Sequence, residues 1–434
     1  MRELSLYIHI PFCVRKCLYC DFLSFSADDI SYVNQERARE KEGIQSGSYV
    51  NQRRTGDGGT AGTIGMQDYV NLLCAEIALR TQYYKKYQVI SVFFGGGTPS
   101  LLPAEEMGQI MDAVRASFVL AEDAEITVEC NPGTVDREKL AYYITRGINR
   151  LSIGLQSADD DELARIGRIH DYETFLKTYR AAREAGFSNI NVDLMTALPG
   201  QTAASYQKTL AQVCALSPEH ISAYSLILEE GTPLYVNQKN YVFPDEDEER
   251  ELYYMTERVL SKAGYHRYEI SNYAREGREC RHNKVYWQHG DYLGLGLGAS
   301  SMVSNVRWKN PEEMAAYRAC VEKLRQIEKK LRVPETAVGM EDFAECLRRS
   351  GSREVQPLTL QEQMEEFMFL GLRLIEGVSE AVFRETFGIS VNEVYGETVE
   401  RLLEQGLLVR MDGRLFLTPL GIDVSNVVFA AFLL

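Results

Sequence analysis

Three cysteines near the N-terminus follow each other at short intervals. Cys13, Cys17 and Cys20 form a C-x3-C-x2-C pattern directly after an apolar segment. Three thiolates this close together can share one polynuclear site, and thiolates suit zinc and iron–sulfur clusters. A structural zinc site needs four ligands, and no fourth cysteine or histidine follows closely. The spacing therefore favours a [4Fe–4S] cluster with one iron open to a further ligand, over zinc and over cysteines that only pack.

A glycine-rich segment follows one of the expected strands. Residues 95–99 have the sequence GGGTP and come directly after an apolar run. Glycines at the end of a strand let the backbone approach a ligand without a Cβ clash. This segment alone is a weak signal, but its position one strand after the cysteines predicts that both belong to one site.

The elements that must position these residues alternate between strands and helices up to about residue 225. Such alternation implies a parallel sheet covered by helices. The polar and glycine-rich segments follow the strands, so we expect them to meet at the carboxyl ends of the strands, where barrel enzymes carry their chemistry. The expected strands are Leu4–Pro11, Val89–Phe94, Glu125–Cys130, Arg150–Gln156, Asn189–Leu194 and His220–Ser225.

The chain divides into regions of different composition. We expect a barrel domain over 1–310, interrupted at 36–66 by a flexible insertion that holds seven glycines. Residues 311–358 are expected to form a helical linker. Residues 359–434 predict three helices, a hairpin and a last helix, which is a winged-helix outline. That outline usually binds DNA, but 361–434 contain five arginines, no lysine and twelve acidic residues, so a structural or lid role is favoured.

Composition and charge limit the function classes. The chain has 434 residues, of which 45% are hydrophobic and 25% charged, as in an ordinary globular protein. The net charge of −15 disfavours broad binding of nucleic acid. There is no apolar run of membrane-spanning length and no signal-peptide core, so we expect a cytoplasmic protein with no transmembrane segment. Nine cysteines in a reducing compartment point to metal, redox or packing roles rather than to disulfides.

The cysteine pattern, with Tyr19 before its last cysteine, resembles that of the radical SAM superfamily. In that superfamily the open iron binds the amino and carboxylate groups of S-adenosylmethionine, and an electron from the cluster generates a 5′-deoxyadenosyl radical. The GGGTP segment resembles the glycine-rich motif that binds the methionine part. The resemblance implies an α/β fold, an incomplete (β/α)6 barrel, with Cys13, Cys17 and Cys20 as the cluster ligands.

Flanking sequences narrow the resemblance. Segments 7–13 (YIHIPFC), 154–157 (GLQS) and 417–421 (LTPLG) are similar to the oxygen-independent coproporphyrinogen III oxidase family. At matching motif positions this resemblance implies a set of cofactor contacts. Around the cluster and the methionine part these are Tyr7, Tyr19, Gly96, Gly97 and Thr98, and at the methionine and ribose they are Glu129, Gln156, Arg168 and Asp193.

Two branches of this family differ in two places. The oxidase branch has a fourth cysteine two residues after the third, where this chain has Phe22. The stretch 282–287, with sequence HNKVYW, is similar to the heme chaperone branch. His282 could ligate heme iron, and Tyr286 and Trp287 offer flat faces to a porphyrin. The alternative is a loop packed on the barrel mouth, in which His282 is an ordinary hydrogen-bonding residue.

The resemblance therefore implies a heme chaperone that binds a [4Fe–4S] cluster, S-adenosylmethionine and heme, and transfers heme to apo-hemoproteins. Arg278 and Arg281 could pair with the porphyrin propionates. Delivery to membrane respiratory enzymes would imply transient membrane contact. The alternative is an oxygen-independent coproporphyrinogen III dehydrogenase, which decarboxylates its substrate to protoporphyrinogen IX. No catalytic residue is assigned, and whether the protein is an enzyme stays open.

Overall fold

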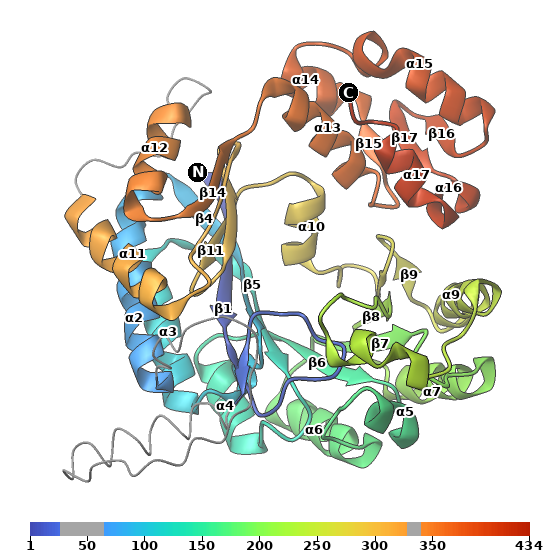
Figure 1. The fold of residues 1–434 in the computed structure, drawn as a ribbon, viewed down its shortest axis with the longest axis horizontal. Helices are drawn as coiled ribbons and strands as arrows, with labels where there is room; N and C mark the ends of the chain where they lie inside the picture. The colour runs from blue at the N-terminus through green and yellow to red at the C-terminus, as the bar shows by residue number, and fades with distance from the viewer. Residues whose placement is uncertain (27–64, 328–339) are drawn as a thin grey trace.

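The computed structural model describes residues 1–26, 65–327 and 340–434. A twelve-stranded sheet organises most of them, and helices cover its outer face (Figure 1). Its centre consists of six neighbouring parallel strands, which confirms the predicted parallel α/β core. In spatial order these strands are β1 (Arg2–Ile10), β4 (Tyr87–Gly96), β5 (Leu120–Cys130), β6 (Arg150–Gln156), β7 (Ile190–Thr196) and β8 (His220–Ser225).

Shorter strands extend the sheet at both edges. Beside β1 lie β11, which is parallel to it, and then three antiparallel strands, while β10 and β9 follow β8. The two edge strands, β14 and β9, do not pair with each other among the strands that the structure describes, so the barrel is incomplete as predicted. The bounds are β11 (Tyr292–Leu295), β12 (Ser300–Val303), β13 (Val306–Lys309), β14 (Arg353–Pro357), β10 (Asn272–Ala274) and β9 (His266–Arg267).

Helices between the central strands bury the outer face of the sheet in one large apolar cluster. Helix starts and ends follow the sequence: Asp171 accepts a hydrogen bond from Thr174 N at the start of α6, and Gly186, at φ +109°, ends it. The helices of this part are α2 (Met66–Arg80), α3 (Ala104–Ser117), α4 (Arg137–Thr145), α5 (Asp160–Arg165), α6 (Tyr172–Ala185), α7 (Ala203–Leu216), α8 (Pro233–Val236), α9 (Glu246–Lys262) and α10 (Arg281–Trp287), with short 3-10 turns η1 (Thr81–Tyr83), η2 (Pro99–Leu101) and η3 (Gln238–Asn240).

The segment expected as a helical linker packs on the barrel. Side chains of α11 (Met314–Ile327) and α12 (Met340–Ser350) belong to the main apolar cluster, and β14 pairs with β13. The boundaries of the three predicted domains stay a prediction. The predicted insertion at 36–66 lies outside the described residues except for Gly65 and Met66, where α2 begins.

The C-terminal part has its own apolar cluster and contains the predicted helices and hairpin. The first helix ends at Gly371, and the backbone that follows it bonds to the barrel: Ile375 N donates to Tyr268 O at 3.0 Å. No helix among the described residues is long and apolar enough to cross a membrane. The elements are α13 (Leu360–Gly371), β15 (Val378–Ser379), α14 (Glu380–Phe387), α15 (Val391–Glu404), β16 (Leu408–Met411), β17 (Arg414–Leu417), α16 (Pro419–Asp423) and α17 (Ser425–Ala430).

Candidate functional site

The three cysteines line one small cavity at the carboxyl end of β1. This cavity, the cysteine pocket, has a volume of about 140 Å³ and contacts Cys13, Cys17 and Cys20. Cys13 lies in β2 (Phe12–Cys13), which pairs in parallel with β3 (Phe25–Ser26). Cys20 N donates to Cys17 O at 3.3 Å, so a tight turn holds the second and third cysteines together.

A chain of hydrogen bonds joins two of these cysteines through residues that follow β4, β5 and α5. Thr98 Oγ1 donates to Cys13 Sγ at 3.5 Å, and Asn131 Nδ2 donates to Thr98 Oγ1 at 2.8 Å. Arg168 Nη2 donates to Asn131 Oδ1 at 2.7 Å, and its Nη1 lies 3.6 Å from Cys17 Sγ. These contacts link the Cys13 and Cys17 side chains to the residues that follow β4 and β5.

The glycine-rich segment holds the end of β4 against the cysteine loop. Gly97 N donates to Ile10 O at 2.8 Å, and Thr98 N donates to Phe12 O at 2.7 Å. A Cβ on Gly97 would lie 2.7 Å from the Phe12 carbonyl oxygen, which is too close for any other residue. Gly96 has φ +110°, a conformation that only glycine adopts easily. The predicted role of this segment in close backbone approach therefore has a structural basis.

Two acidic side chains enter the same pocket from β5 and β7. Glu129 accepts a hydrogen bond from Gly96 N at 3.3 Å, and burial, followed by the nearby Asp193, raises its pKa to about 8. Asp193 accepts from Ser152 Oγ at 3.0 Å and from Asn191 Nδ2 at 2.7 Å, and burial raises its pKa as well. Carboxylates in such a position can accept hydrogen bonds from an amino group or from ribose hydroxyls.

Gln156 reaches the pocket through an unusual backbone. It ends β6 at φ +72°, and the pairing of β6 with β7 shifts register between Gly154 and Gln156. A positive φ in a residue other than glycine is sparsely populated and is enriched at ligand sites. Arg168 supports this turn, because its Nη2 also donates to Gly154 O at 2.6 Å.

Eleven of the predicted site residues thus line the cysteine pocket. These are Cys13, Cys17, Tyr19, Cys20, Gly96, Gly97, Thr98, Glu129, Gln156, Arg168 and Asp193. No three His, Cys, Asp or Glu side chains among the described residues converge closely enough to share a single metal ion. A [4Fe–4S] cluster does not need that convergence, because each cysteine binds a different iron. The donor set of three thiols, two carboxylates, an amide and a guanidinium fits a cluster with an amino-acid-bearing ligand.

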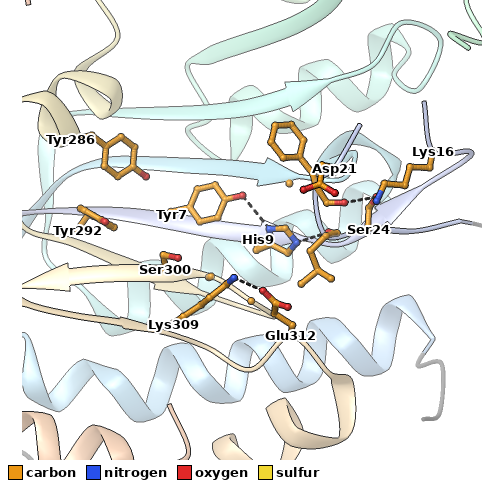
Figure 2. A pocket seen from close by; sticks show the side chains of 15 residues that line it. Tyr7, His9, Lys16, Asp21, Ser24, Tyr286, Tyr292, Ser300, Lys309 and Glu312 are labelled. Atoms are coloured by element: carbon orange, nitrogen blue, oxygen red, sulfur yellow. Dashed lines mark hydrogen bonds and ion pairs between the residues drawn. The ribbon is translucent and has the colours of Figure 1, made fainter. Parts of the chain in front are cut away.

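Tyr7 faces a larger cavity beside the cysteine pocket (Figure 2). This cavity, the histidine cavity, has a volume of about 680 Å³. Tyr7 OH and His9 Nδ1 lie 3.1 Å apart, and His9 Nε2 lies 2.9 Å from Leu23 O. Burial lowers the pKa of His9 to about 4, so the ring is neutral, with its proton on Nε2 facing the carbonyl and Nδ1 accepting from Tyr7. Figure 2 shows Tyr286 and Tyr292 at one end of this cavity and Lys16 at the other.

The helix α10 carries the predicted heme-binding residues, and a buried carboxylate fixes its start. Glu125 on β5 accepts hydrogen bonds from Arg281 N at 3.1 Å and His282 N at 3.2 Å. His282 Nδ1 lies 2.9 Å from Ser91 Oγ, and its Nε2 lies 2.9 Å from Tyr286 OH. Burial lowers the pKa of His282 to about 3, so the imidazole is neutral, and both of its nitrogens have partners.

The predicted heme residues do not all line the same cavity. His282 and Tyr286 line a third cavity of about 430 Å³, the barrel cavity, together with Tyr7 and Tyr19. Trp287 instead lines a separate cavity of about 300 Å³ against the C-terminal part, and the Arg373 guanidinium lies 4.4 Å from its ring centroid. The structure therefore does not bring Trp287 together with the other two.

Several residues that line or brace the site were not predicted. Asn131 joins Arg168 to Thr98, and it begins an Asn-Pro-Gly turn after β5 that is visible in the sequence. His9, on β1, was not predicted as a site residue, and it lines the histidine cavity. Ser152 was also missed, and the alternation of polar and apolar residues along β6 is the signal that would have indicated it.

Two family models match this chain. The model of the radical SAM superfamily matches residues 7–213, and the model of the HemN C-terminal domain matches residues 358–424.

Similar proteins include heme chaperones from bacteria. Heme chaperone HemW from Bacillus subtilis (strain 168) is 33% identical over 434 residues, covering 99% of this chain and 99% of the relative. Heme chaperone HemW from Escherichia coli (strain K12) is 37% identical over 301 residues, covering 69% of this chain and 70% of the relative. A mouse protein named radical S-adenosyl methionine domain-containing protein 1, mitochondrial, is 32% identical over 410 residues, covering 93% of this chain and 81% of the relative.

Among solved structures, the radical SAM enzyme coproporphyrinogen III oxidase (HemN) from Escherichia coli has a similar fold. The TM-score is 0.75 at 21% sequence identity, and the match covers 100% of this chain and 90% of that chain.

Proposed function

Because this chain belongs to the heme chaperone HemW family within the radical SAM superfamily, we propose that it binds heme and transfers it to apo-hemoproteins. The observation that carries the proposal is the match to a heme chaperone along nearly the whole of both chains. Phe22, at the position where the oxidase branch has a fourth cysteine, supports the same assignment.

Membership of the superfamily implies a [4Fe–4S] cluster and S-adenosylmethionine. Cys13, Cys17 and Cys20 would hold the cluster, which when bound would supply the electron for cleavage of the sulfonium. The glycine-rich segment and Gln156 would contact the methionine part of the cofactor. Its carboxylate would meet the Arg168 guanidinium, which is the cation nearest to a cluster cysteine in the hydrogen-bond chain described above.

The heme contacts are proposed at the face of α10 that lines the barrel cavity. His282 would reach iron only after its Nε2 gives up the hydrogen bond to Tyr286 OH. Tyr286 itself could ligate iron, since tyrosine is a known axial ligand. Trp287 lies on the other side of the helix, at the boundary with the C-terminal part, so it would not contact heme in the barrel cavity.

The recipients would be apo-hemoproteins, including membrane respiratory enzymes that the protein meets transiently from the cytoplasm. The acidic C-terminal part gives no support for contact with nucleic acid. The alternative activity is oxidative decarboxylation of coproporphyrinogen III. Its support is the fold shared with HemN, but a likeness at 21% identity shows only the fold and not the activity.

The experiment is a hemin titration of the full-length protein after anaerobic reconstitution, followed in the Soret region. We expect one saturable site. His282→Ala should weaken it if His282 is the ligand, whereas Tyr286→Phe should then leave binding unchanged or strengthen it, because it frees Nε2. If Tyr286→Phe weakens hemin binding and His282→Ala does not, Tyr286 is the iron ligand. His266→Ala, which changes an exposed histidine paired with Glu279, is the matched control.

Absence of saturable hemin binding would contradict the chaperone proposal. Turnover of coproporphyrinogen III by the same preparation would then support the oxidase alternative.

A further inference from the structure

The barrel cavity contains one positively charged side chain among its described lining residues, Arg150. Arg150 is the first residue of β6, and its side chain is 2% exposed. Its Nε has no hydrogen-bond partner in the part of the chain that the structure describes. The guanidinium reaches Glu125 only at 4.0 Å, which is an ion-pair distance but not a hydrogen bond.

The carboxylates around Arg150 already have other donors. Glu125 accepts from the start of α10, Glu129 accepts from Gly96 N, and Asp193 accepts from Ser152 and Asn191. None of these contacts supplies the in-plane pair of hydrogen bonds that a guanidinium can donate. Arg150 is therefore a buried cation with Glu125 at ion-pair distance, and its Nε keeps an unfilled donor position among the described residues.

A second unpartnered group lies beside it. Thr127 on β5 is the register partner of Arg150 on β6, and its buried Oγ1 has no hydrogen-bond partner among the described residues. Buried polar groups almost always have partners, so two unpartnered groups at neighbouring positions indicate a place for a polar ligand or for ordered water.

We propose that Arg150 binds a carboxylate of the ligand that enters the barrel cavity. This inference rests on the proposed function, under which that ligand is a tetrapyrrole and the carboxylate is a propionate. Arginine suits the role because its planar fork donates two parallel hydrogen bonds to a carboxylate. Arg281, which the sequence suggested for this task, is instead held by Asp123, whose Oδ2 lies 2.8 Å from its Nη2.

The test compares hemin with hemin dimethyl ester, in which both propionates are neutral, on the full-length reconstituted protein. We expect hemin to bind about 10- to 100-fold more tightly than the ester, the range for a hydrogen-bonded charged pair. In Arg150→Gln the two ligands should bind with similar affinity, because hemin loses affinity and the ester does not. Arg150→Lys should keep part of the preference, and the surface variant Arg146→Gln should keep all of it.

Equal affinity of the unsubstituted protein for hemin and its ester would overturn the inference, and no variant would be needed for that conclusion. Arg150 Nε and Thr127 Oγ1 would then be assigned to hydrogen bonds with ordered water. A preference that survives in Arg150→Gln would also overturn it, while the proposed function would stand. If hemin does not bind at all, the proposed function fails, and the same comparison with coproporphyrin III and its tetramethyl ester decides whether Arg150 recognises a carboxylate.

Discussion

The start of α10 offers a direct test of how a buried carboxylate positions the site. Glu125 and Asp123 lie two residues apart on β5, and both contact the first residue of α10. Glu125 is buried and accepts two backbone hydrogen bonds, whereas the Asp123 side chain is 73% exposed. The perturbation is to remove each charge in turn, as Glu125→Gln and as Asp123→Asn.

The expected cost of Glu125→Gln follows from its contacts. Glutamine keeps one carbonyl oxygen but places an NH2 group where the second carboxylate oxygen accepted, so one helix N–H loses its partner. Hydrogen bonds to charged groups contribute about 1.5–3 kcal/mol each, and removing one member of a buried ion pair costs at least as much. A local loss of about 3 kcal/mol should speed the opening of α10 by roughly 150-fold.

The assay is amide hydrogen exchange of residues 281–287, measured by mass spectrometry in both variants. Exchange should accelerate strongly in Glu125→Gln and stay near that of the unsubstituted protein in Asp123→Asn, because solvent screens the exposed pair. A change below about threefold in Glu125→Gln, or equal changes in the two variants, would refute the claim that burial sets the strength of this contact.

Four further predictions address the pockets. Cys17→Ala should lose iron after anaerobic reconstitution, with loss of absorbance near 400 nm, whereas Cys74→Ala on α2 should keep it; full iron in Cys17→Ala would exclude the cluster assignment. Glu129→Ala should weaken S-adenosylmethionine binding by about tenfold or more in equilibrium dialysis, and unchanged binding would remove Glu129 from the site. The pKa of Glu129 is raised to about 8, so the native state without ligands holds a proton that the unfolded chain releases near pH 4.5. The free energy of unfolding should therefore fall as pH rises from 4.5 to 8, by the order of 2 kcal/mol since part of the side chain faces the pocket. Urea unfolding of Glu129→Gln should lack this fall. Trp287→Ala should leave hemin affinity within about twofold and increase hydrogen exchange in α13, since the ring stacks on Arg373; a large loss of hemin affinity would return Trp287 to the heme site.

The positions of the cluster and cofactor residues could be predicted because they depend on strand order. Glu129 and Gln156 lie at or near the carboxyl ends of β5 and β6, and Asp193 lies in the middle of the neighbouring strand β7. Parallel strands bring their carboxyl ends to one edge of the sheet. The alternation of strands and helices was visible in the sequence, so convergence of these residues followed from the fold class. Asn131 was missed because its role depends on a side-chain contact with Arg168 rather than on periodicity.

The heme residues were harder to predict because their direction depends on an element that the sequence did not clearly indicate. Residues 281–287 form a helix of only seven residues, and its start depends on Glu125, more than 150 positions away. Once the helix is known, its geometry explains why Trp287 lies apart from the other two residues. His282 and Tyr286, four residues apart, share a face, and Trp287 is turned about 100° from Tyr286. The same geometry places His282 Nε2 against the Tyr286 hydroxyl, so the nitrogen that would bind heme iron already has a hydrogen-bond partner on the same helix. A chaperone must release heme as well as bind it, and a tyrosine hydroxyl that competes with iron for one imidazole nitrogen would weaken the bond in a way that Tyr286→Phe measures directly.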